Sequence, residues 1–356
     1  DGTAHFQPTL YTGDGSVRSI DQTENSTFQP DMVWIKNRSQ ADPHMLIDAT
    51  RGVTKELNPD TYTPETTDAN GLTSFDSDGF GLGTGAGGYN DNTESFVAWQ
   101  WLAGGGAGSS NTDGTINTTT TTVNTTAGIS IGTYTGTGVA ATIGHGLGVA
   151  PDFVICRERS GDGVGGQWYV YSIGNKTSPA PEDGYLAMNE PQPANDNATT
   201  WNDTAPTSTV FTIGTNDDIN EADSLYVCYV FAGIEGFSKF FKYTGNGDAD
   251  GTFVYTGFKP AFILIKRTDA STAPGGETDW VMYDSQRSPY NEIDDQLIVN
   301  RTAAETTGSD ELDFLANGFK LRTADMFVNA SGGNYIFMAF AEYPFGGDGA
   351  TPSTAF

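Results

Sequence analysis

The sequence predicts an all-β protein made of three tandem antiparallel β-sandwich (jelly-roll-like) modules related by an internal repeat. First, a Tyr-Thr-Gly tripeptide occurs three times, beginning at Tyr11, Tyr134 and Tyr243. These starts are 123 and 109 residues apart, which suits a small domain rather than a solenoid unit. Second, short apolar runs alternate with Gly, Asn, Asp and Pro turns. Third, no long stretch has the 3.6-residue period of an amphipathic helix.

Each expected module carries the same landmarks in the same order. An apolar strand begins at a proline, where a missing N–H is tolerated, at Pro30, Pro151 and Pro260. An aromatic strand closes each module, over residues 95–101, 224–231 and 334–340. We therefore expect modules at 1–103, 128–235 and 236–347, each with its own aromatic core, followed by a tail at 348–356. Residues 231–237 join the last two modules without a linker, so we expect these to pack together and module one to be tethered more loosely.

Residues 104–127 differ from the modules in composition. Their first half is rich in Gly and Ser, which is typical of a flexible linker, and Thr118–Thr122 is an unbroken Thr run. β-branched Thr prefers extended backbone, so the second half is either an extended arm or a solvated tether.

The charge of the chain excludes some partners. Its 356 residues have a formal net charge of -28 and a sequence pI of about 4.1. Such a surface repels phosphate backbones and anionic lipid, so we expect no nucleic-acid binding. No apolar run approaches the roughly 18 residues of a membrane span, so we expect no membrane insertion.

The two cysteines, Cys156 and Cys228, both fall on expected strands of module two. Buried thiols that act as small hydrophobic groups are the favoured interpretation. A disulfide is the alternative if the two strands are neighbours.

One loop resembles the start of a calcium site. Asn246, Asp248 and Asp250 supply oxygen ligands at alternate positions and Gly251 follows, but Gly257 stands where a calcium loop needs a Glu. A hairpin turn is the alternative, and no other cofactor is expected.

The sequence contains no convincing catalytic pair. Glycosidases place two carboxylates across a sugar, whereas Glu182-Asp183 and Asp294-Asp295 are adjacent, and adjacent strand residues point to opposite faces. We therefore predict no catalytic residue and no enzyme.

Aromatic residues in loops that are unique to one module are the ligand-binding candidates. They are Tyr62, Tyr89, Trp201 and Tyr290. An exposed ring can stack on a sugar, and partial burial in the fold is the alternative for each.

Three segments resemble a family of tailed-phage virion proteins, usually called tail fibre or uncharacterised structural proteins of marine phages. They are residues 28–39, 68–80 and 243–260, which include the Phe28-Gln29-Pro30-Asp31 and Asp76-Ser77-Asp78-Gly79-Phe80 sequences. The resemblance covers essentially the whole chain and implies a component of the virion.

From the resemblance and the repeats we expect a non-enzymatic virion protein, such as a tail fibre, spike or head decoration. It would contact other virion proteins, assemble as a homotrimer and bind host-surface glycans weakly at many sites. One alternative is a purely structural capsid or tail decoration or connector. The other is a depolymerase of surface polysaccharide.

Overall fold

The structure is a computed structural model that describes residues 2–85, 87–161, 166–175, 180–269, 278–308 and 311–343. These residues form antiparallel sheets, so the predicted all-β class is confirmed. The helices described are single turns: η1 (Gly2–Ala4), η2 (Pro181–Asp183), α1 (Ala198–Trp201) and α2 (Asp217–Asn220). The expected tail at 348–356 lies outside the described residues.

The first unit has a main sheet in the order β1-β9-β3-β4. Its strands are β1 (Phe6–Thr12), β9 (Ser95–Trp101), β3 (Met32–Asn37) and β4 (Met45–Asp48). A smaller sheet in the order β2-β8-β7 contains β2 (Arg18–Asp21), β8 (Gly79–Leu82) and β7 (Leu72–Asp76). The short strands β5 (Lys55–Glu56) and β6 (Thr66–Thr67) pair with each other.

The second unit has a main sheet in the order β10-β11-β18-β13-β14-β15-β16. Its strands are β10 (Thr120–Asn124), β11 (Ile129–Thr135), β18 (Leu225–Phe231), β13 (Phe153–Glu158), β14 (Trp168–Ser172), β15 (Gly184–Ala187) and β16 (Asn195–Asp196). The smaller sheet pairs β12 (Ala141–Gly144) with β17 (Val210–Ile213). The Thr run reaches into β10, so this part of residues 104–127 is an extended arm on the edge of β11.

The third unit has a main sheet in the order β19-β26-β21-β22-β23. Its strands are β19 (Ser238–Thr244), β26 (Asn334–Tyr343), β21 (Lys259–Arg267), β22 (Trp280–Asp284) and β23 (Leu297–Ile298). The smaller sheet, in the order β20-β25-β24, contains β20 (Phe253–Tyr255), β25 (Gly318–Leu321) and β24 (Leu312–Leu315).

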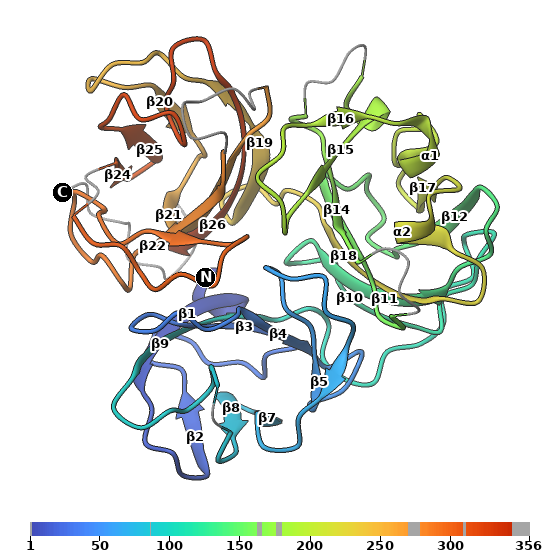
Figure 1. Ribbon diagram of the computed structural model, residues 1–356, viewed down its shortest axis with the longest axis horizontal. Helices are drawn as coiled ribbons and strands as arrows, with labels where there is room; N and C mark the ends of the chain where they lie inside the picture. The colour runs from blue at the N-terminus through green and yellow to red at the C-terminus, as the bar shows by residue number, and fades with distance from the viewer. Residues whose placement is uncertain are drawn as a thin grey trace.

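The three units surround a common centre (Figure 1), with each main sheet toward the centre and each smaller sheet outside. In all three main sheets the strand that contains the Tyr-Thr of the tripeptide (β1, β11 or β19) pairs with the last strand (β9, β18 or β26), which pairs in turn with the proline-led strand (β3, β13 or β21). The three main sheets thus share one strand order, and the internal repeat stays a prediction from the sequence.

Alternate residues of β9 and β18 face different cores, whereas the buried apolar residues of β26 all belong to the central one. In β9, Phe96 and Ala98 pack inside the first unit, while Val97, Trp99 and Trp101 belong to a central core that contains residues of all three units. Period-two side-chain direction explains the division, and coverage of both faces explains why β9 is apolar at nearly every position.

The central core corrects two expectations. Module one is not loosely tethered, because the ring of Phe262 in the third unit packs against Trp99 and Trp101 at centroid distances of 5.8 and 6.1 Å. The units also do not hide wholly separate interiors, since Phe340 packs against both Phe6 of the first unit and Phe231 of the second. The loose-tether expectation rested on chain connectivity, which does not record these long-range contacts.

In each seam, a ring nitrogen of one unit forms a hydrogen bond with a backbone carbonyl of a neighbouring unit. These bonds run from the third unit to the second, from the second to the first and from the first to the third. Trp280 Nε1 donates to Ala187 O at 2.9 Å, and Trp168 Nε1 donates to Asn58 O at 3.1 Å. His44 Nε2 lies 3.0 Å from Ile298 O. Because His44 Nδ1 accepts the Trp34 Nε1 hydrogen at 3.0 Å, the neutral ring carries its proton on Nε2 and donates it to Ile298.

Two further sets of contacts join the same neighbours. Cationic side chains donate across the seams in three pairs, Lys36 to Thr302 O, Arg157 to Thr63 O and Lys266 to Pro191 O. Backbone N–H groups do so in three more, Glu305 to Arg38 O, Glu65 to Arg159 O and Ala194 to Thr268 O. The units therefore form a closed ring of head-to-tail contacts inside one chain.

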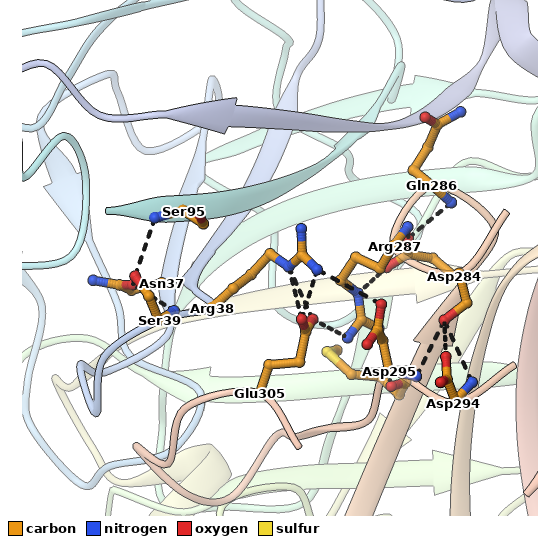
Figure 2. Close-up of polar contacts among 12 residues, drawn as sticks. Asn37, Arg38, Ser39, Ser95, Asp284, Gln286, Arg287, Asp294, Asp295 and Glu305 are labelled. Carbon is orange, nitrogen blue, oxygen red and sulfur yellow. Dashed lines mark hydrogen bonds and ion pairs between the residues drawn. The ribbon is translucent and has the colours of Figure 1, made fainter. Parts of the chain in front are cut away.

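Two seams also carry buried or half-buried ion pairs. Arg38 holds both carboxylate oxygens of Glu305 (Figure 2), with an Nη2–Oε1 distance of 2.6 Å. Arg159 holds both oxygens of Glu65 at 2.8 and 3.0 Å. The planar guanidinium suits this bidentate geometry, which fixes orientation as well as distance.

Cys156 and Cys228 form a disulfide, so the favoured thiol interpretation is wrong. The two residues face each other on the neighbouring strands β13 and β18, with Cα atoms 4.3 Å apart. Sequence could not reveal this pairing, because it depends on the register of strands that are 72 residues apart.

Replacement of Trp280 by Phe tests the ring of N–H donors. We expect it to lower the free energy of unfolding by about 0.5–1.5 kcal/mol more than Trp101→Phe does, because the seam loses the Trp280–Ala187 hydrogen bond while Ala187 O keeps the backbone N–H of Glu190. Trp101 is the matched control, since it is equally buried and its Nε1 has no hydrogen-bond partner. Urea unfolding of both variants measures the difference, and equal losses would contradict a role for the bond.

The pH dependence of stability tests His44. Burial first, and the nearby Lys36 charge second, lower the pKa of His44 from 6.5 to about 3. Between these values the unfolded chain binds a proton that the folded chain does not, so stability is lost as pH falls, by at most about 1.4 kcal/mol per pH unit. We expect His44→Gln, which can still donate to Ile298 and accept from Trp34, to lack this increment in urea unfolding between pH 4 and 8. An unchanged slope would show that His44 does not titrate in this way.

Candidate ligand-binding site

The strongest candidate site is a hollow of about 430 Å³ on the third unit. Its walls come from the first residue of β21, the loop that follows β22, the end of β24 and the end of β26. The lining residues are Lys259, Ser285, Ser288, Pro289, Tyr290, Asn291, Ile293, Phe314, Ala316 and Glu342. A hollow of this size can hold a small ligand such as one or a few sugar rings.

Tyr290 projects from the rim of this hollow and is 83% exposed, the highest value among the large apolar and aromatic residues described. The chain on its N-terminal side is fixed by Asp284, whose carboxylate accepts the backbone N–H groups of Gln286 and Arg287 (Figure 2). Arg287 is buried and its Nε lies 2.5 Å from Asp284 Oδ2. The exposed ring therefore stands on a firmly held loop.

The C-terminal side of the same loop is also held. Ser288 Oγ accepts the backbone N–H of Asp295 at 3.1 Å, which closes a turn. The Asn291 amide pairs with the backbone of Phe314, donating to its carbonyl and accepting from its N–H at 2.9 Å each. Side-chain pairing of this kind replaces a strand partner and fixes the loop against β24.

Charge in the hollow is balanced. Lys259 Nζ lies 2.9 Å from Glu342 Oε2, and both side chains are about one-fifth exposed. The exposed part of this pair offers a donor and an acceptor side by side. With the Ser285 hydroxyl and the Tyr290 ring, it suits an uncharged ligand that has both hydroxyl groups and an apolar face.

Of the four aromatic candidates, Tyr290 and Tyr62 are exposed and Tyr89 and Trp201 are not. Tyr62 is 50% exposed and lies beside Gly166 of the second unit, away from the hollow. Tyr89 and Trp201 are each 2% exposed, so their assignment as exposed aromatics is wrong. Tyr89 donates to Glu56 at 2.7 Å and Trp201 packs edge-on against Tyr171, so both rings serve the fold.

The candidate calcium loop is a turn between β19 and β20. Asn246 Oδ1 accepts the N–H of Asp248, and Asp248 Oδ1 accepts the N–H of Asp250. Asp250 pairs with Lys320 at 2.6 Å, and the hydrogen bond and charge of Lys320 lower the pKa of Asp250. The proposed ligand oxygens thus already accept hydrogen bonds within the protein.

Among the described residues, three carboxylates that the sequence analysis did not select form a cluster. Oxygens of Asp42, Asp91 and Glu94 lie within 4.8 Å of one another. They also accept N–H groups, since Asn37 Nδ2 donates to Asp42 and Glu94 and the backbone of Gly88 donates to Asp91.

In the part of the chain described, no helix is long and apolar enough to cross a membrane.

Sequence reasoning missed the other walls of the hollow. Lys259 and Glu342 stand at the ends of strands far apart in the chain, and Phe314 comes from a third strand. No motif or spacing links them. Only the exposed Tyr290, a loop aromatic unique to one module, could be selected from sequence.

No curated protein is significantly similar to this chain. Residues 1–344 match a protein family described as a domain of unknown function (DUF7483). The match spans nearly the whole chain and includes all three units and the Tyr290 hollow. The chain therefore belongs to the DUF7483 family.

Proposed function

We propose that this chain is a non-enzymatic structural protein of a virion surface, in a tail fibre, spike or head decoration, and that it contributes to attachment to host-surface glycans. The hollow behind Tyr290 carries the attachment part of the proposal. It combines an exposed aromatic ring, a hydroxyl group and a balanced ion pair on a fixed loop. Stacking plus paired donors and acceptors is how proteins hold sugar rings.

The way in which the three units are joined supports a structural role. Three units joined by head-to-tail hydrogen bonds and a shared aromatic core resist shear better than units on flexible linkers. A rigid support keeps Tyr290 in place, which lowers the ordering cost of binding. The loop itself is anchored through Asp284 and Asn291.

Avidity fits the modest size of the site. One hollow of this kind supplies weak affinity, and many copies on one particle would multiply it. We propose that the chain assembles as a homotrimer with other virion proteins. The charge of -28 would keep the particle soluble and away from nucleic acid.

Replacement of Tyr290 by Ala tests the attachment role. We expect the variant to lose about tenfold in affinity for the glycans that the wild type binds on an array, because a stacked ring contributes roughly 1 kcal/mol or more. Thermal unfolding should be unchanged, since the side chain is 83% exposed.

Tyr62→Ala is the matched control, because it removes another exposed tyrosine that does not line the hollow. Equal losses in both variants would point to non-specific aromatic adhesion. Failure of the wild type to bind any glycan would favour a purely structural decoration. Release of reducing ends from host polysaccharide would favour a depolymerase instead.

A further inference from the structure

A second hollow, of about 720 Å³, lies where the second and third units join. Its walls include Asp152 of the second unit, residues of the 233–240 segment that leads into β19, and residues 255–257 at the end of β20. Tyr255 is 58% exposed here. Lys239 Nζ lies 5.1 Å from the centroid of that ring and donates to Tyr255 O at 3.0 Å, which holds the ring in place.

The two hollows flank one short turn. Tyr255, Thr256 and Gly257 line the second hollow, and Lys259, two residues further on, lines the first. At an extended spacing of roughly 3.5 Å per residue, Tyr255 and Lys259 lie at most about 14 Å apart. The turn is firm, because Thr256 Oγ1 donates to Phe258 O at 2.6 Å and Phe258 is fully buried.

Gly257 lines the second hollow two residues before Lys259, which lines the first. Its φ of +93° is a conformation that residues with a side chain rarely adopt. A Cβ at this position would lie 3.6 to 3.9 Å from the Tyr255 ring. The glycine thus places no side chain against the hydroxyl edge of Tyr255.

We propose that the two hollows form a single track that binds an extended, uncharged oligosaccharide, with Tyr290 at one end, Tyr255 at the other and the Gly257 turn between them. This inference rests on the proposed function and assigns the ligand class. An exposed aromatic ring at each end gives two stacking surfaces, which one sugar ring cannot occupy together.

The charges select a neutral ligand. In the first hollow Lys259 is paired with Glu342, and in the second Lys239 is offset by Asp152 and Glu235. Neither hollow has an excess of positive charge, and the chain as a whole carries -28. A polyanionic glycan would be repelled, whereas hydroxyl groups can use these charged donors and acceptors.

The test measures affinity against ligand length in the full chain. Probes are length series of neutral glucan, mannan and galactan oligosaccharides, from monosaccharide to hexasaccharide, with an oligogalacturonate series as the charged comparison. We expect at least one neutral series to bind more tightly with length until both rings are covered. Tyr290→Ala and Tyr255→Ala should each weaken the hexasaccharide several-fold to about tenfold.

Shorter ligands separate the two ends. The affinity for a disaccharide should fall in only one of the two variants. Tyr62→Ala should leave the affinity unchanged for both the disaccharide and the hexasaccharide. If Tyr290→Ala weakens the hexasaccharide and Tyr255→Ala does not, the track is wrong while glycan attachment at Tyr290 stands. Tighter binding of oligogalacturonate, or no binding to any neutral series, also overturns the track. Loss of all glycan binding on an array would overturn the attachment function as well.

Discussion

Each unit donates a buried ring N–H to a backbone carbonyl of its neighbour. Ala187, Asn58 and Ile298 accept from ring nitrogens of the adjacent unit. A buried ring N–H without an acceptor costs about as much as a lost hydrogen bond, so a shift of one unit along its neighbour that keeps the seam dry is unfavourable. The bonds run in one direction around the centre, which makes the three seams interdependent. This constraint accounts for the rigid body on which the Tyr290 loop stands.

Head-to-tail contacts build either closed rings or open fibres. Here the ring closes after three units within one chain, so the faces that join the units are used up. Any further assembly, including the proposed homotrimer, must use other surfaces. The smaller sheets and their loops point away from the centre (Figure 1) and remain available for partners.

The sequence revealed the strands better than their partners. Pro30 and the aromatic run to Trp101 placed β3 and β9 correctly, because turn chemistry and residue type are local signals. When a strand is apolar on both faces, its sequence shows that both faces are buried but not which residues bury them. Whether Trp99 meets its own unit or Phe262 of another depends on tertiary packing, as do the disulfide and the burial of Tyr89. Sequence could select Tyr290 as a loop aromatic but, for the same reason, could not show that Lys259 and Glu342 line the hollow beside it.

The seam between the second and third units differs from the other two. In two seams, the residues joined by the backbone hydrogen bond also form an ion pair, Arg38 with Glu305 and Arg159 with Glu65. In the third seam the residues joined by this bond are Thr268 and Ala194, which carry no charge. In the strand register, Met338 takes the place of Trp99 and Tyr229, which donate to Asp284 and Asp48 across their seams.

Chain connectivity explains the difference. The second unit passes into the third without a linker, so these two units meet at a high effective concentration and need fewer polar contacts to stay together. The first unit reaches the second only through the Gly-rich stretch after Ala103, and its seams carry the ion pairs. The hollow lined by Lys239 and Tyr255 lies at the seam where the two units are joined directly.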